Sequence, residues 1–188
     1  DVVRRLLDAG AEVNAQDNLG LTAIIYAGFS KKGLEISRLL VDRGANIHKK
    51  SKNCITALMI ASQYSHDTDL LNYYIQNGLG INEVDDKWQS PLMLASAYNN
   101  SDIVEYLLIS GAYVNATDTR GRTALMYAAQ YSRDQSVIYK LLEGGADIDA
   151  LDFDKKDALM FAVKYRHSTA MLSNLNNKHR YKKFIGES

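Results

Sequence analysis

The sequence predicts a mainly α-helical solenoid, in which short helix-turn-helix units stack side by side. Two sets of landmarks recur at one interval. Glycine is followed by a small or aliphatic residue at positions 10, 44, 78, 111 and 145, which are 34, 34, 33 and 34 residues apart. Helix-start triplets that begin at positions 22, 56, 90, 123 and 157 keep the same spacing. Two landmark sets that stay in step over five units indicate a repeat protein.

Each unit is expected to begin with a turn and an inner helix. The triplets start with Thr, Ser or Asp, whose side-chain oxygen accepts hydrogen bonds from free N–H groups at a helix start. We therefore predict helix N-caps at Thr22, Thr56, Ser90, Thr123 and Asp157. Small residues such as Ala128 and Ala129 follow, and they let the neighbouring unit approach closely.

A second, outer helix completes the unit. Ile103, Val104, Leu107 and Leu108 form an amphipathic stripe at helical spacing. The glycine that follows suits a left-handed helix end, and the polar segment 115–121 suits a hairpin-like turn. Two short helices and a turn cannot bury their apolar residues alone, so the units must stack.

Residues 118–126, which read DTRGRTALM, and residues 111–116, which read GAYVNA, resemble the ankyrin repeat. The resemblance extends from residue 1 to about residue 172. It implies an ankyrin-type helix-turn-helix solenoid with hairpin-like turns, about five repeats and a partial N-terminal one, in a single domain 1–188. The expected units are a partial repeat 1–16, repeats 17–50, 51–84, 85–117 and 118–151, a degenerate capping repeat 152–175 and a basic tail 176–188. Ile or Met replaces the histidine of the family motif in every unit.

Composition and motifs argue against several classes of function. Lys plus Arg and Asp plus Glu both number 22, so no net charge attracts the chain to nucleic acid. The longest apolar stretch is too short to cross a bilayer, which predicts no membrane partner and a cytoplasmic protein, or one in a host cytosol if it is a secreted effector. The basic tail is interpreted as a solvated chain end rather than a partner site.

No residue pattern predicts catalysis. His48, His66, His167 and His179 fall at unrelated repeat positions, and none has a second candidate ligand four residues on, as a helical metal site needs. Gly144-Gly145 is not followed by the Lys and Ser or Thr of a phosphate-binding loop. We therefore expect no enzyme activity, no metal and no cofactor.

The resemblance implies that a partner lies along the concave face, formed by the turn tips and the inner helices. Tip residues expected on that face are Lys52, Asn53, Lys87, Arg120 and Arg122. Trp88, like Cys54, replaces a turn glycine, at a tip position where no core is expected, and we predict that it contacts the partner.

A tyrosine ends the inner helix of four successive units. These residues are Tyr64, Tyr98, Tyr131 and Tyr165, with Ser30 at this position in the first full unit. Packed helices would place the tyrosines in a row about 10 Å apart. Two interpretations stay open: tyrosines are frequent interface hot spots, or each one seals the junction between its own two helices.

The functional prediction is a monomeric protein–protein interaction module that binds a partner protein on the concave face. The alternative is a regulatory ankyrin segment of a longer enzyme, channel or bacterial effector, which docks on another domain of its own chain. The chain starts directly with an outer helix, without the turn and inner helix of that unit, and this supports the alternative.

Overall fold

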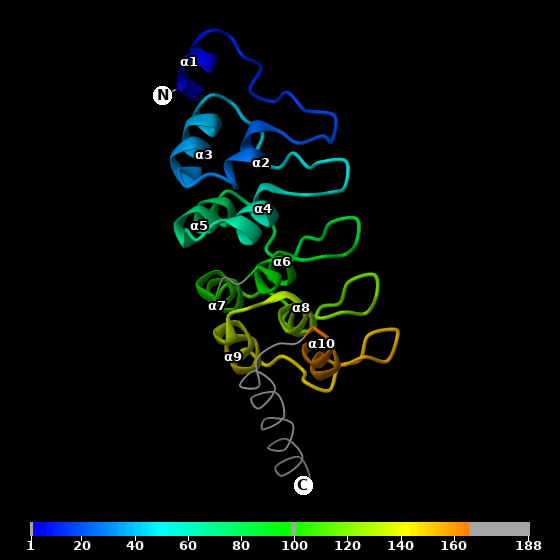
Figure 1. Ribbon diagram of the computed structural model, residues 1–188. Helices are drawn as coiled ribbons and strands as arrows, with labels where there is room; N and C mark the ends of the chain where they lie inside the picture. Colours follow the sequence, from blue (N-terminus) through cyan, green and yellow to red (C-terminus); the bar gives the residue numbers. More distant parts are fainter. Residues whose placement is uncertain (1, 99–100, 166–188) are drawn as a thin grey trace.

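The computed structural model describes residues 2–98 and 101–165, and within these ranges it contains ten helices and no strand. Figure 1 shows two layers of helices, with a hairpin projecting beside each inner helix. The inner layer contains α2 (Ala23–Ala27), α4 (Ala57–Tyr64), α6 (Pro91–Ala97), α8 (Ala124–Tyr131) and α10 (Ala158–Lys164). The outer layer contains α1 (Val2–Asp8), α3 (Gly33–Asp42), α5 (Thr68–Gln76), α7 (Ser101–Ile109) and α9 (Gln135–Glu143). The predicted helical solenoid is confirmed.

Four of the five expected N-caps form. Thr56, Ser90, Thr123 and Asp157 each accept a hydrogen bond from the N–H three residues on, at 3.2, 3.3, 3.4 and 2.7 Å. Thr22 precedes α2 without making this bond, and its Oγ1 atom is buried with no partner among the described residues. The expectation is wrong for that residue. A helix start without a capping bond is less stable, and α2 is the shortest of the ten described helices.

The core lies between the two layers. Methionines at the position of the motif histidine, Met59, Met93 and Met126, are almost completely buried. Tyr74 of α5 is also buried, and its hydroxyl donates to the Ile24 carbonyl oxygen at 3.2 Å and lies 2.8 Å from Ser37 Oγ. Burial raises the pKa of Tyr74 to about 12. The phenol therefore stays neutral and ties an outer helix to the preceding repeat.

The hairpin tips are joined to one another by backbone hydrogen bonds. In each case an N–H of one tip donates to a carbonyl oxygen of the tip before it, at 2.9 to 3.0 Å. The pairs are Lys52 to Leu19, Asp86 to Asn53, Thr119 to Lys87 and Phe153 to Arg120. This ladder holds the tips in a row along one side of the inner helices (Figure 1).

One turn position of the tip requires a left-handed backbone. Gly20 and Gly121 occupy it with φ of 80° and 77°. Cys54 and Trp88 stand there with φ of 61° each, and Lys155 with 63°. A side chain in this region is strained, typically by about 1–2 kcal/mol. The sequence indicated the replacement of glycine by Cys54 and Trp88, and Lys155 is a third case.

Candidate protein-binding surface

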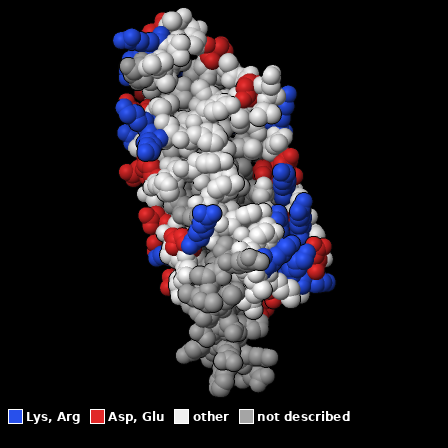
Figure 2. All heavy atoms as spheres, viewed as in Figure 1, with Lys and Arg blue, Asp and Glu red and all other residues white. Residues whose placement is uncertain are grey.

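Four of the five inner helices present an uncharged face. Helices α2, α4, α6 and α8 contain no Asp, Glu, Lys or Arg. In Figure 2 uncharged side chains fill most of the middle of the visible face, over the inner layer, whereas charged side chains gather along its two edges. We call the surface formed by the inner helices and the hairpin tips the inner face.

Aromatic side chains line this face in a row, which we define as Phe29, Tyr64, Tyr98 and Tyr131. Their side chains are 46%, 46%, 52% and 48% exposed. Ring centroids are 4.7 Å apart for Phe29 and Tyr64 and 5.8 Å apart for Tyr64 and Tyr98. The expected spacing of about 10 Å is therefore wrong for the rings of Tyr64 and Tyr98, which lean toward each other.

The row begins at Phe29 rather than at Ser30. Helix α2 is short, and Ser30 lies beyond it, where its Oγ accepts a hydrogen bond from the N–H of Lys32 at 3.1 Å. Phe29 supplies the ring that packs against Tyr64, with the two ring planes tilted by 38°. A strict interval of 34 residues selected the serine and missed the aromatic residue beside it.

The aromatic side chains at the ends of the inner helices are partly packed and partly exposed, as both interpretations of the tyrosines require. Each ring of the row contacts a neighbouring ring or a residue of its own repeat; the ring centroids of Tyr131 and Tyr127, for example, are 6.2 Å apart. Each residue nevertheless keeps about half of its surface open to solvent. Tyr165, at the end of α10, is 43% exposed, with the Lys164 ammonium 5.4 Å from its ring centroid. These side chains are therefore held in place and also accessible.

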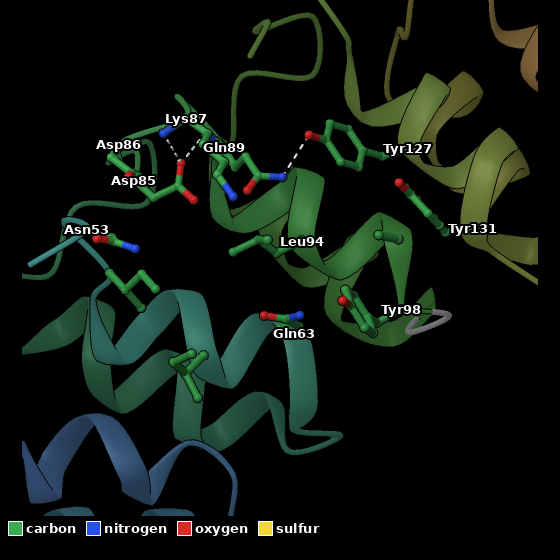
Figure 3. Close-up of a pocket in the computed structure, with 13 residues that line it drawn as sticks. Asn53, Gln63, Asp85, Asp86, Lys87, Gln89, Leu94, Tyr98, Tyr127 and Tyr131 are labelled. Atoms are coloured by element: carbon green, nitrogen blue, oxygen red, sulfur yellow. Dashed lines mark hydrogen bonds between the residues drawn. The ribbon is translucent and has the colours of Figure 1, made fainter. Parts of the chain in front are cut away.

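Four of the predicted partner-binding residues meet in one hollow of about 490 Å³, which lies between two tips and helices α4, α6 and α8 (Figure 3). They are Asn53 and Lys87 from the tips and Tyr98 and Tyr131 from the aromatic row. The other lining residues are Ile55, Ile60, Gln63, Asp85, Asp86, Gln89, Leu94, Ala97 and Tyr127.

The other predicted residues lie outside this lining. Lys52, Trp88 and Arg120 are exposed on the tips, and the Trp88 side chain is 61% exposed. Tyr64 lies in the aromatic row beside the hollow. Arg122 is largely enclosed and is engaged by partners within its own repeat. The basic tail, His167 and His179 lie outside the described residues.

Asp118 organises the fourth tip. Its Oδ1 accepts hydrogen bonds from the N–H groups of Arg120 and Arg122, both at 2.8 Å. Its Oδ2 accepts from the Tyr127 hydroxyl at 2.8 Å and from Nε and Nη2 of Arg122 at 2.9 and 2.7 Å. Burial acts to raise the pKa of Asp118, but these hydrogen bonds outweigh it and hold the pKa below its usual range. The carboxylate is fully satisfied and ionised.

The first full repeat uses the same pair. Tyr26 donates its hydroxyl to Asp17 Oδ2 at 2.8 Å, while Asp17 Oδ1 accepts from two N–H groups of the tip. The hydrogen bond from Tyr26 is the largest cause that lowers the pKa of Asp17. In both repeats the tyrosine follows the aspartate by nine residues. Sequence reasoning missed this pair, although the common spacing could have indicated it.

Asp85 of the third tip has no such tyrosine, because Leu94 stands nine residues after it. Its Oδ1 accepts from the N–H groups of Lys87 and Gln89 at 2.9 and 2.7 Å. The residue is only 9% exposed, and burial raises the pKa of this carboxyl despite the two backbone hydrogen bonds. Gln89 is turned toward the fourth repeat, where its Nε2 donates to the Tyr127 hydroxyl at 2.7 Å.

A family model for ankyrin repeats (three copies) matches residues 30–118, 58–152 and 92–177. The chain belongs to the ankyrin repeat family. Ankyrin repeats are in general protein–protein interaction modules built on a non-catalytic fold. No curated protein matches the chain.

Across the described residues, no helix has the length and apolar character needed to cross a membrane. In the same part of the chain, no group of three or more His, Cys, Asp or Glu residues is placed to hold a metal ion.

Proposed function

We propose that the inner face of this ankyrin stack binds a partner protein through the aromatic row, the adjoining hollow and Trp88. The observation that carries the proposal is the row of half-exposed aromatic rings at or just beyond the ends of helices that contain no charged residue. Aromatic side chains combine large apolar area with little conformational freedom, and tyrosine and tryptophan are enriched in interface hot spots. A partner that covers a solvent-exposed row of this kind removes its apolar area from water, which favours binding.

The hairpin tips supply the charges that would orient the partner. Lys52, Lys87 and Arg120 project from the second, third and fourth tips, beside the uncharged helices. Charges at the rim of an interface guide association and fix the register more than they add affinity. Affinity is therefore assigned to the aromatic row and Trp88, and specificity to the tips.

The test uses two matched double variants of the full chain. Tyr98→Ser with Tyr131→Ser removes two rings of the aromatic row, and Tyr113→Ser with Tyr139→Ser removes two exposed tyrosines away from the row. The first pair is expected to weaken capture of the partner at least tenfold, since one central aromatic anchor is worth about 2 kcal/mol or more. The second pair is expected to bind normally.

Stability measurements on the same variants decide between contact and packing. Substitution of partly exposed residues is expected to lower the free energy of unfolding by about 1 kcal/mol or less for each pair. A large loss of stability with Tyr98→Ser and Tyr131→Ser, together with binding that falls only in proportion to the unfolded fraction, would identify the tyrosines as junction seals. Equal loss of binding in both pairs would also contradict the proposal.

A further inference from the structure

The hollow coincides with a gap in an internal pattern of the repeats. The position nine residues after the first polar residue of each tip holds Tyr26, Ile60, Leu94, Tyr127 and Phe161 in successive units. An aromatic ring therefore stands there in three units, and an aliphatic side chain in two. Ile60 and Leu94, the two aliphatic residues, both line the hollow. The space between the tips and the inner helices opens where two successive units lack the ring.

The missing ring also leaves one carboxylate oxygen without its usual donor. In the first and fourth tips, a tyrosine hydroxyl donates to Oδ2 of the aspartate at 2.8 Å. Asp85 keeps the two backbone donors to Oδ1, but among the described residues none donates to its Oδ2. Figure 3 shows this carboxylate directed into the hollow. A side chain that is nine-tenths buried thus presents an unpaired acceptor to the open space.

We propose that the hollow receives a tyrosine side chain of the partner protein, whose ring lies over Ile60 and Leu94 and whose hydroxyl donates to Asp85 Oδ2. This inference rests on the proposed function and names the chemistry of the partner at its central contact. The partner's phenol would occupy the place that Tyr127 occupies beside Asp118 in the next repeat.

The lining favours a neutral donor over a charged one. Asp85 and Asp86 disfavour an anion, so a phosphorylated tyrosine is excluded from the hollow. Lys87 lines the same space, offsets one of the two carboxylates and so weakens the attraction for a cation, such as an arginine or lysine of the partner. Ile55, Leu94 and other apolar residues offer a surface for a ring. A phenol combines the apolar ring with one neutral O–H donor and so matches both parts of the lining.

The volume of the hollow fits a side chain together with part of its backbone. About 490 Å³ lies within the range of about 300–1,000 Å³ that is typical of sites for small organic groups. One phenol ring does not fill it. The amide side chains of Asn53 and Gln63 face the remaining space, and such amides can pair with the peptide groups of an extended segment.

The first test measures binding of side-chain analogues to the isotope-labelled full chain by NMR titration. The probes are 4-methylphenol for tyrosine, toluene for phenylalanine, 4-methylphenyl phosphate for phosphotyrosine and n-propylguanidinium for arginine. 4-Methylphenol is expected to shift the amide signals of Gln63, Leu94 and Ala97 and to bind roughly fivefold or more tightly than toluene, because only the phenol donates to the carboxylate. The phosphate and the guanidinium are expected not to bind there.

Three variants check the assignment to Asp85 and the hollow. Leu94→Tyr places a ring and a hydroxyl in the hollow from within, and it is expected to abolish the shifts caused by 4-methylphenol. Leu6→Tyr makes the same change on the exposed side of α1 and is expected to leave the titration unchanged. Asp85→Asn keeps an acceptor for the two backbone N–H groups, and it is expected to reduce 4-methylphenol binding to the level of toluene.

Several outcomes would overturn the inference. Equal binding of toluene and 4-methylphenol would remove the role of Asp85, and tighter binding of n-propylguanidinium would assign the hollow to a cation. An unchanged titration with Leu94→Tyr would place the probe elsewhere. If any of these is found while Tyr98→Ser with Tyr131→Ser still weakens partner capture at least tenfold, the partner-binding function stands and only the tyrosine pocket is rejected.

Discussion

The third and fourth repeats have the same order of elements: a tip, an inner helix and an outer helix. They differ in whether side chains of the repeat itself donate hydrogen bonds to the aspartate of the tip. The fourth has Gly121 at the left-handed turn position, where the third has Trp88. The fourth has Tyr127 over its tip, where the third has Leu94. As a result Asp118 is enclosed by side-chain donors, whereas the corresponding aspartate of the third repeat relies on backbone donors alone.

The proposed binding role of the third repeat rests on this difference. Arg122 pairs with Asp118 and lies 4.6 Å from the centroid of the Tyr127 ring, so the fourth tip is locked to its helix. The third repeat retains a strained backbone, an unpaired carboxylate oxygen and an open hollow. Functional surfaces commonly carry features that lower the stability of the fold. In the proposed complex, the partner donates to Asp85 the hydrogen bond that Tyr127 donates to Asp118 within the fourth repeat.

The largest expected effect compares the two aspartates directly. Asp118→Asn is expected to lower the free energy of unfolding by about 2–3 kcal/mol at neutral pH, because Arg122 is left without its charged partner in a largely buried site. Asp85→Asn is expected to be neutral or slightly stabilising, since it removes a buried charge that has no side-chain donor. Urea unfolding of both variants at pH 7 measures the difference.

The effect of pH sharpens the same comparison. The folded chain lowers the pKa of Asp118, so its stabilisation is present above the unfolded value of about 3.9 and is lost as the pH falls through the folded value. Asp85 has a raised pKa, so its contribution is present below the unfolded value and is lost as the pH rises through the folded value. The two Asn variants should therefore differ less at about pH 3 than at pH 7. A constant difference would contradict the assignment.

A smaller effect comes from the hydroxyl that distinguishes the two repeats. Tyr127→Phe keeps the ring but removes the donor to Asp118 and the acceptor for Gln89, which should cost about 1–2 kcal/mol in urea unfolding. Tyr26→Phe is the matched control, because its hydroxyl makes the same bond at an exposed site and should matter less. If both variants lose the same stability, the enclosure of the fourth tip has no special role.

The arrangement of the repeats could be predicted from sequence because the repeat imposes it on every unit. Capping residues and glycines recur at fixed intervals, and four of the five capping bonds form as the residue types indicate. The spacing also marked Trp88, through the glycine that it replaces. Because the same capping residues and glycines recur in five units, they strongly constrain the fold.

Much of the candidate site lies at positions that the repeat leaves free. Asn53, Lys87, Tyr98 and Tyr131 were selected as face residues and meet in the hollow. The hollow itself could not be predicted, because it arises from the absence of a ring at Leu94 and at the position one repeat earlier. The missing ring can be recognised only by comparison with the tertiary contact that Tyr127 makes in the next repeat.

The smallest expected effect concerns the turn residue, where the two repeats differ in backbone strain. Trp88→Gly gives the third tip the residue of the fourth. It should relieve about 1–2 kcal/mol of left-handed strain, of which the greater freedom of glycine in the unfolded chain offsets about 0.5–1 kcal/mol. The net expectation is a gain in stability of about 0.5 kcal/mol, measured by urea unfolding.

Cys54→Gly makes the equivalent change in the second tip, at the same φ of 61°, and should give a similar gain. The two variants should differ in binding, because only Trp88 places a large aromatic side chain, 61% exposed, beside the inner face. Trp88→Gly is therefore expected to weaken partner capture at least tenfold, and Cys54→Gly to leave it unchanged. If Trp88→Gly instead destabilises the chain, the tryptophan packs as part of the fold, and the third repeat is no more open than the fourth at this position.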